Sequence, residues 1–180
     1  MDTVLVTPRL RLSPPTVADV PRIVELVNDP DIAAFTLAIP YPYTEADAVT
    51  WLSILNANWR ERSAFSFAIR TEEDGMVGAV GLHLSVKYGH AELGYWMGAP
   101  YRKRGYVREA VGAVIDFGFR ETDVRRIHAI HHVDNPASGA VLRANGLRHE
   151  ASLADYVMRK DEVWSVEQYR ILRSEWLNQK

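Results

Sequence analysis

The pattern of apolar positions changes several times along the first third of the chain. Residues 9–12 alternate polar and apolar side chains and predict a strand, which Pro14 and Pro15 end. Residues 16–27 and 44–62 instead carry apolar side chains at helical spacing. Each of these two segments begins with a threonine that is followed three residues later by an aspartate, a short-armed capping box. The pattern therefore predicts one strand and then two helices.

The second helix and the stretch before it differ in character. We expect one buried face on the helix, made by Val49, Leu52, Leu55 and Trp59. The stretch from 28 to 43 holds three prolines and three aromatic residues, and we expect a long loop with a short helical turn there.

The middle of the chain predicts strands. Residues 65–69 and 77–84 alternate apolar with small or polar side chains, and the Asp74-Gly75 turn signal between them predicts a hairpin. Residues 91–97 are apolar at positions on both faces, which predicts a central strand.

After Met97 the period changes to that of a helix. A basic segment, residues 101–105, leads into a helix with a buried stripe made by Val107, Ala110, Val111, Val114, Ile115 and Gly118. A strand over 126–133, a helix from Pro136 to about Asn145, and strands near 147–150 and 163–172 follow. This order predicts an α/β fold in one domain over residues 1–180.

Composition and charge exclude several classes of protein. The 180 residues are 47% hydrophobic and 24% charged, as in ordinary globular proteins. A net charge of -2 argues against direct nucleic-acid binding driven by overall charge. The absence of cysteine excludes disulfides, zinc–cysteine sites and a cysteine nucleophile, and is consistent with the cytoplasmic location that we expect. No apolar run is long enough for a membrane span, and the first twelve residues do not resemble a secretory signal.

The basic turn is the segment most suggestive of chemistry. Arg102, Lys103 and Arg104 precede Gly105 and the start of a helix. Free N–H groups at a helix start favour an anion, and glycine allows the backbone to approach it closely. Arg102 and Arg104 are candidates for bidentate contacts to phosphate oxygens. The alternative is a solvated basic loop.

This turn resembles the acetyl-CoA pyrophosphate loop of the GNAT superfamily of N-acetyltransferases. The family pattern, Arg or Gln, two residues, Gly, one residue, then Gly or Ala, is matched here by Arg102, Gly105 and Val107. Val107 departs from the pattern, because its branched side chain needs room beside a phosphate. Segment 91–97 resembles the central strand of the family, and segment 135–147 its second cofactor motif.

Two further segments resemble one branch of the family. Residues 7–12 and the pair Glu175-Trp176 are similar to segments of the branch that acetylates N-terminal amines of ribosomal proteins. The resemblance implies a single mixed, mostly antiparallel sheet with flanking helices. It also implies acetyl transfer from acetyl-CoA to a primary amine, in particular the α-amine of a protein N-terminus, such as that of a ribosomal protein. A small-molecule amine acceptor and a non-catalytic acetyl-CoA-binding module remain alternatives, and we expect a monomer or a homodimer.

The resemblance also assigns cofactor-binding residues. They are Met97, Arg102, Lys103, Arg104, Gly105, Tyr106, Val107 and Asn135. In the family, the backbone of Met97 would bind the pantetheine arm where the central strand parts from its neighbour. Asn135 has an alternative role as a turn residue before Pro136.

The expected catalytic residues are Ser138 and Glu92. Ser138 matches a serine that protonates the leaving thiolate in the ribosomal branch, and its alternative is a hydroxyl that caps a helix start. Glu92 lies on the central strand and is a candidate base for the amine, with a structural ion pair as its alternative. Asp155 is a second candidate base.

Histidines and the acceptor pocket complete the expectations. His128, His131 and His132 are further candidate bases, but their spacing suggests no metal site. Because long loops in compact domains are often functional, we expect residues 29–43 to shape the acceptor pocket.

Overall fold

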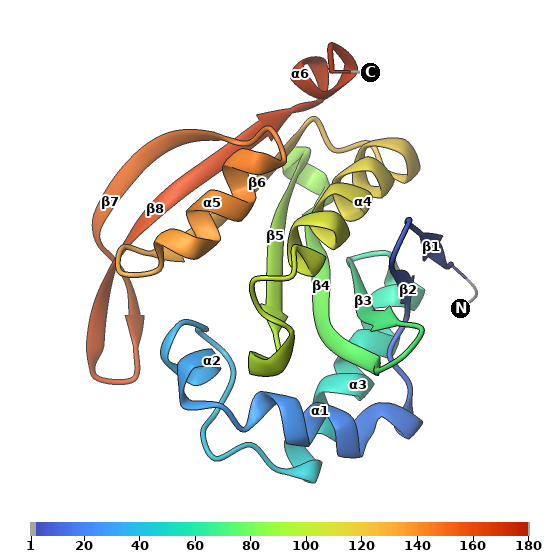
Figure 1. The fold of residues 1–180 in the computed structure, drawn as a ribbon. Coiled ribbons are helices and arrows are strands. Elements are labelled where there is room, and N and C mark those ends of the chain that lie inside the picture. The colour runs from blue at the N-terminus through green and yellow to red at the C-terminus, as the bar shows by residue number, and fades with distance from the viewer. Residues whose placement is uncertain (1–2, 180) are drawn as a thin grey trace.

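The computed structural model describes residues 3–179 and contains one eight-stranded sheet in the order β1-β2-β3-β4-β5-β6-β8-β7 (Figure 1). All neighbouring strands are antiparallel except β5 and β6. The strands are β1 (Leu5–Val6), β2 (Arg11–Ser13), β3 (Ala64–Thr71), β4 (Gly75–Ser85), β5 (His90–Met97), β6 (Arg126–His132), β7 (Arg148–Arg159) and β8 (Glu162–Leu172). The expected mixed, mostly antiparallel sheet is confirmed.

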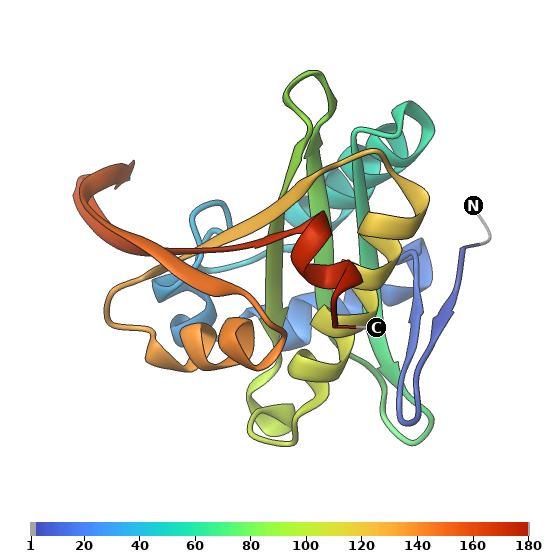
Figure 2. The same cartoon turned by 90° about the horizontal axis from the view of Figure 1, so that it is seen from above.

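Helices cover both faces of this sheet. They are α1 (Val20–Val27), α2 (Pro30–Ala34), α3 (Glu45–Glu61), α4 (Tyr106–Glu121), α5 (Pro136–Ala144) and α6 (Arg173–Leu177). In Figures 1 and 2, α4 and α5 lie on one side of the sheet, whereas α1 and α3 lie on the other. None of the helices in residues 3–179 is both long and apolar enough to cross a membrane.

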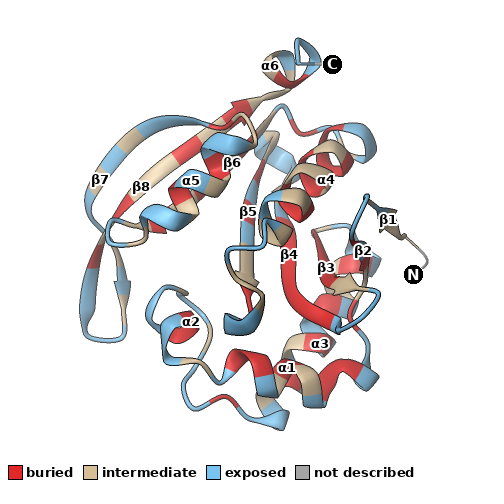
Figure 3. Cartoon of the chain, in the orientation of Figure 1, coloured by how far each residue is buried: buried red, intermediate tan, exposed pale blue. Residues whose placement is uncertain are grey.

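Two hydrophobic clusters hold these layers together. The larger joins α4 to the sheet through fully buried side chains such as Val111, Val114 and Leu82. The smaller joins α1 and α3 to the opposite face of β3 and β4 through Ile23, Leu52 and neighbours. Buried positions accordingly concentrate on β3, β4 and the inner side of α4 in Figure 3.

Local sequence signals account for most of the element boundaries. The backbone N–H of Thr44 donates to Asp47, and the backbone N–H of Asp47 donates back to the threonine hydroxyl, so the predicted capping box opens α3. The Thr16 box opens a short 3₁₀ turn, Val17–Asp19, that runs into α1. The predicted loop over 28–43 contains the five-residue helix α2.

Three expectations about individual positions need correction. Val49 is 49% exposed, and Ala48 takes its place on the buried face of α3. The strand expected near 147–150 is the start of the longer β7, which bulges where it passes β8. β5 is central as expected, but Glu92 and Gly94 are exposed on one of its faces because a cavity lies there.

Candidate functional site

The candidate site is built around the point where β5 and β6 part. The two parallel strands pair only at their beginnings, where His90, Ala91 and Glu92 lie opposite residues 126–128. Beyond that point β5 continues along β4 and β6 continues along β8, and the two ribbons diverge in Figure 1. The parting that the family resemblance implied is therefore present.

A large cavity opens at this parting. Its volume is about 1220 Å³, and its walls come from β4, β5, β6, α5, the start of α4 and the segment 31–43. Binding pockets for a single small molecule usually span about 300–1,000 Å³. The cavity is therefore large enough for two substrates to meet inside it.

The alternation of β5 divides the residues around this cavity between two sides of the sheet. Ala91, Leu93 and Tyr95 pack with the cluster beneath α4. Trp96, on the other face of the strand, packs with the cluster of α1 and α3. Glu92 and Gly94 share that second face because side chains alternate along a strand.

One end of the cavity is the N-terminus of α4. Gly105 is the N-cap residue, with φ at +79°, and Lys103 two residues earlier also has a positive φ of 62°. This left-handed turn suits glycine, and the free N–H groups of the 16-residue helix follow it. A positively polarised helix end beside Lys103 and Arg104 fits the pyrophosphate of a coenzyme A thioester.

The structure places the side chain of Arg102 differently from the expected phosphate contact. Its Nη2 donates to Asp29 Oδ2 at 2.5 Å and its Nη1 to Asp31 Oδ2 at 3.2 Å. Its Nε donates to the carbonyl oxygen of Met97 at 3.2 Å. Because the guanidinium is held by three acceptors, Arg102 ties the cofactor turn to α2 and to the end of β5.

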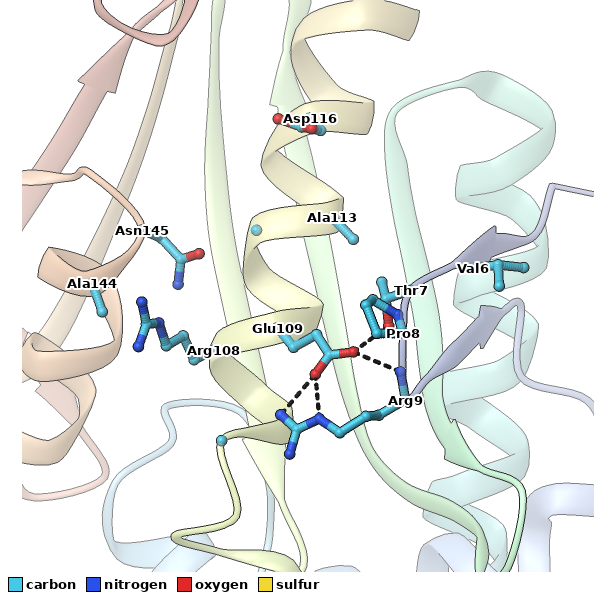
Figure 4. Close-up of a pocket in the computed structure, with 12 residues that line it drawn as sticks. Val6, Thr7, Pro8, Arg9, Arg108, Glu109, Ala113, Asp116, Ala144 and Asn145 are labelled. Carbon is cyan, nitrogen blue, oxygen red and sulfur yellow. Dashed lines mark hydrogen bonds and ion pairs between the residues drawn. The ribbon is translucent and has the colours of Figure 1, made fainter. Parts of the chain in front are cut away.

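Arg9 is a cation of the cofactor turn that the sequence reasoning did not assign. Figure 4 shows Glu109 of α4 receiving hydrogen bonds from Thr7 and from the backbone and side chain of Arg9. The guanidinium of Arg9 also donates to the carbonyl of Arg104 and lies 5.0 Å from the ring centre of Tyr106. The residues 7–12 that carry the branch resemblance therefore brace the turn.

The charge of Glu109 is preserved by these contacts. Burial raises its pKa, but the hydrogen bonds from Thr7 and Arg9 outweigh burial and leave the pKa below its usual value. Glu109 thus stays ionised as a counter-charge for Arg9. A second hollow of about 600 Å³ runs over this outer side of α4, between the 6–9 segment and Asn145 (Figure 4).

The hydroxyl of Ser138, on α5, lies next to the hydroxyl of Tyr95, on β5. The tyrosine and serine hydroxyl oxygens are 2.7 Å apart, and the tyrosine oxygen is also 3.2 Å from the carbonyl oxygen of Ser138. Burial raises the pKa of Tyr95 to about 12, although the hydrogen bond to Ser138 lowers it slightly. Tyr95 is therefore a neutral hydroxyl at physiological pH, and sequence reasoning had not singled it out.

Asn135, whose alternative role was that of a turn residue before Pro136, is the N-cap residue of α5. Its side-chain oxygen accepts from the backbone N–H of Ser138 at 3.3 Å and so begins α5. Both residues line the cavity. The cap places Ser138 in the first turn of α5, next to the opening between β5 and β6.

The candidate bases lie in different places. Glu92 lines the cavity, opposite His83 on β4 and His128 on β6, and its carboxylate makes no hydrogen bond or ion pair within residues 3–179. Asp155 lies in the exposed bulge of β7, where its backbone N–H donates to Ser165, and it does not line the cavity.

The three histidines of β6 contact rings on the neighbouring strands β5 and β8. His128 Nε2 lies 3.3 Å from His90 Nδ1, and burial lowers the pKa of His128 while nearby Glu92 opposes that shift. His131 Nδ1 lies 2.8 Å from the carbonyl oxygen of His132, and its ring stacks on Tyr169. Across residues 3–179, no three His, Asp or Glu side chains are grouped to hold a metal ion.

The segment 29–43 lines the cavity, as the pocket hypothesis requires. Asp31, Phe35, Leu37 and Tyr43 are among its cavity-lining residues. The segment is held from two directions, by Arg102 at α2 and by Arg159 of β7, whose Nε donates to the carbonyl of Thr36 at 2.8 Å. Trp59, in contrast, is a core residue that packs edge-on against the rings of Phe65 and Phe67.

Comparison with known proteins agrees with this architecture. A family model described as "Acetyltransferase (GNAT) domain" matches residues 9–148, and the chain belongs to this family. The chain is similar to N-acetyltransferase p20 of Bacillus licheniformis, with 27% identity over 174 residues, 96% of this chain and 97% of the relative.

Two solved structures illustrate the range of proteins with this fold. One is an acetyltransferase from Salmonella typhimurium that modifies the N-terminal serine of a 50S ribosomal subunit protein. It has a TM-score of 0.84 and 20% identity, with 94% of this chain and 99% of that chain covered. The other is spermidine N-acetyltransferase from Vibrio cholerae in complex with CoA and spermine. It has a TM-score of 0.80 and 19% identity, with 96% and 100% coverage.

The chain is therefore an N-acetyltransferase that uses acetyl-CoA as its co-substrate. The reaction class follows from the family. The residues predicted to bind each substrate are open to mutational test.

We expect Gly105→Asp to reduce the affinity for acetyl-CoA at least tenfold, because it adds a carboxylate where the pyrophosphate is predicted to bind. Calorimetric titration with acetyl-CoA measures the change. Gly75→Asp is the matched control: Gly75 also has a positive φ, +66°, but lies in the β3–β4 turn with nothing within 4 Å of an added Cβ. Equal affinities of wild type and Gly105→Asp would refute the assignment.

Proposed function

We propose that this enzyme acetylates the α-amine of a peptide or protein N-terminus. The observation that carries the proposal is the character of the cavity on the Glu92 side of β5. Of the three carboxylates lining the cavity, Asp31 is paired with Arg102 and Asp47 accepts from Thr44, whereas the Glu92 carboxylate makes no hydrogen bond or ion pair among residues 3–179. A carboxylate without a hydrogen bond or ion pair, in a cavity with largely apolar walls, matches an acceptor with one cationic amine.

The proposed reaction is direct transfer. The neutral amine nitrogen attacks the thioester carbonyl carbon, the carbon–sulfur bond breaks, and the coenzyme A thiolate leaves. Ser138 donates a proton to that thiolate, and Tyr95 supports Ser138 through the hydroxyl–hydroxyl contact. The proton lost by the amine goes to Glu92, directly or through water.

The energetics of deprotonation favour an α-amine at this site. An α-amino group with a pKa near 7.8 needs only about 1 kcal/mol to become neutral at pH 7, whereas a lysine side chain needs about 4.6 kcal/mol. A site with a single unpartnered carboxylate suits the smaller demand.

An acceptor screen by mass spectrometry tests the proposed function. The panel contains peptides with free α-amines, the same peptides with blocked α-amines and an internal lysine, and spermidine. Acetylation of the free α-amine peptides supports the proposal. Acetylation of spermidine or of internal lysine, without transfer to an α-amine, would refute it.

We predict that Ser138→Ala lowers turnover by about 10²-fold or more, with a smaller change in the Michaelis constant for acetyl-CoA, because an acid acts mainly in the transition state. Thermal denaturation separates this effect from a loss of helix stability. If only the melting temperature falls, the serine is a structural residue.

Tyr95→Phe keeps the ring and removes the hydroxyl that contacts Ser138. We expect turnover to fall by up to about tenfold, the equivalent of one hydrogen bond. The double variant should be no slower than Ser138→Ala alone if Tyr95 acts through the serine. Fully multiplicative losses in steady-state assays would show that the two hydroxyls act independently.

Glu92→Gln should slow the reaction most at low pH, since glutamine keeps the shape of glutamate but accepts no proton. Raising the pH supplies neutral amine from solution and should partly restore the rate, because the α-amine titrates near pH 7.8. A pH–rate profile with a peptide α-amine measures this, and Asp155→Asn provides the comparison. A constant ratio of variant to wild type at every pH would mean that Glu92 is structural.

A further inference from the structure

The cavity extends beyond the part where the acetyl-CoA thioester is predicted to bind. This extension is an apolar chamber. Its walls are aromatic and aliphatic side chains from α2, the segment after it, α3 and β5, among them Ile32, Leu37, Ile39, Tyr43, Trp51 and Trp96. Several of these belong to or pack against the hydrophobic cluster of α1 and α3, which forms the floor of the chamber. The chamber is thus a continuation of a folded core.

Each carboxylate at this end of the cavity already has a hydrogen-bond partner. Asp31 accepts from Arg102, and Asp47 accepts from the backbone and hydroxyl of Thr44. Arg102 of the cofactor turn is engaged by Asp29 and Asp31. An occupant of the chamber therefore meets mainly apolar side chains, and the ionised carboxylate of Asp47 is engaged by Thr44.

Three polar groups of the chamber are hydrogen-bond donors of aromatic side chains. The indole N–H groups of Trp51 and Trp96 and the hydroxyl of Tyr43 make no hydrogen bond within residues 3–179. Burial, with Asp47 nearby, raises the pKa of Tyr43 to about 12, so this hydroxyl stays neutral. Such rings bind an apolar group and can donate to a neighbouring carbonyl.

Gly94 connects the chamber with the reaction site. It lies between Glu92 and Trp96 on the same face of β5, and an added Cβ would meet nothing within 4 Å. Glu92 and Trp96 are four residues apart, roughly 13 Å along an extended strand. An amine beside Glu92 or Gly94 therefore leaves room for its substituent to extend towards Trp96.

We infer, on the basis of the proposed function, that the preferred acceptor carries a large apolar or aromatic group next to its amine, and that this group occupies the apolar chamber. For a peptide this group is the side chain of the first residue. Phenylalanine or leucine should therefore be preferred over alanine, serine and lysine at that position.

Peptides that differ only in the first residue test the inference. A hydrophobic pocket distinguishes even single methylene groups by about 10- to 200-fold, so kcat/KM for Phe- and Leu-peptides should exceed that for Ala- and Ser-peptides at least tenfold. A preference for Ser, Ala or Lys would overturn the inference while leaving α-amine acetylation intact.

Small amines separate the failure of the two proposals. If phenylethylamine is acetylated and no peptide is, the peptide function fails but the preference for an apolar substituent holds. If spermidine is acetylated faster than phenylethylamine, the inference is overturned. If no amine reacts, calorimetric titration of phenylalanine amide into the enzyme with coenzyme A decides, and absence of binding overturns the inference.

A pair of exposed residues on α3 provides matched variants. Ile54 lines the cavity and is 53% exposed, whereas Val49 is 49% exposed and does not line it. Ile54→Lys should therefore reduce the ratio of kcat/KM for Phe-peptide over Ser-peptide at least fivefold, and Val49→Lys should leave the ratio unchanged. Equal losses for both peptides in Ile54→Lys would contradict a role in selecting the first side chain.

Discussion

The parting of β5 from β6 is the constraint on which the site depends. Each strand keeps one full antiparallel partner, β4 for β5 and β8 for β6, so most of the backbone hydrogen bonding is preserved when the two strands separate. The parallel pairing of their first residues keeps the strands together at one end. The remaining length of β5 is left free beside a cavity, where its backbone can approach a substrate.

Segments far apart in the sequence enclose this opening. The 7–9 segment is bound to Glu109 and braces the cofactor turn, and α5 brings Ser138 to Tyr95. Arg102 joins the same turn to Asp29 and Asp31 at α2, which begins the wall of the apolar chamber. The parts of the cavity predicted to bind the co-substrate and the acceptor therefore share a direct ionic link.

Side-chain alternation along β5 places the residues proposed to act on the co-substrate and on the acceptor on opposite faces of the strand. Tyr95 lies on the face that packs beneath α4 and α5, where Ser138 is placed to protonate a leaving thiolate. Glu92, Gly94 and Trp96 lie on the other face, where an amine and its substituent can enter. Tyr95 therefore faces the proposed co-substrate side, and its neighbours Gly94 and Trp96 face the proposed acceptor side, because successive side chains of a strand point to opposite faces.

Local patterns in the sequence determined most of the helices and strands, because each depends on residues close together in the chain. The same holds for the capping boxes of Thr16 and Thr44, the β3–β4 hairpin, the buried stripe of α4 and the cofactor turn. The sequence also suggested the family and Ser138. The partners of individual side chains depend on tertiary structure: the binding of Arg102 by Asp29, the bracing of Glu109 by Arg9, and the contact between Tyr95 and Ser138. These pairs are 43 to 100 residues apart in the sequence, and no local period records which distant side chain will lie opposite. The exposure of Val49 and the apolar chamber likewise followed only from the packing of α2 and α3 against the sheet.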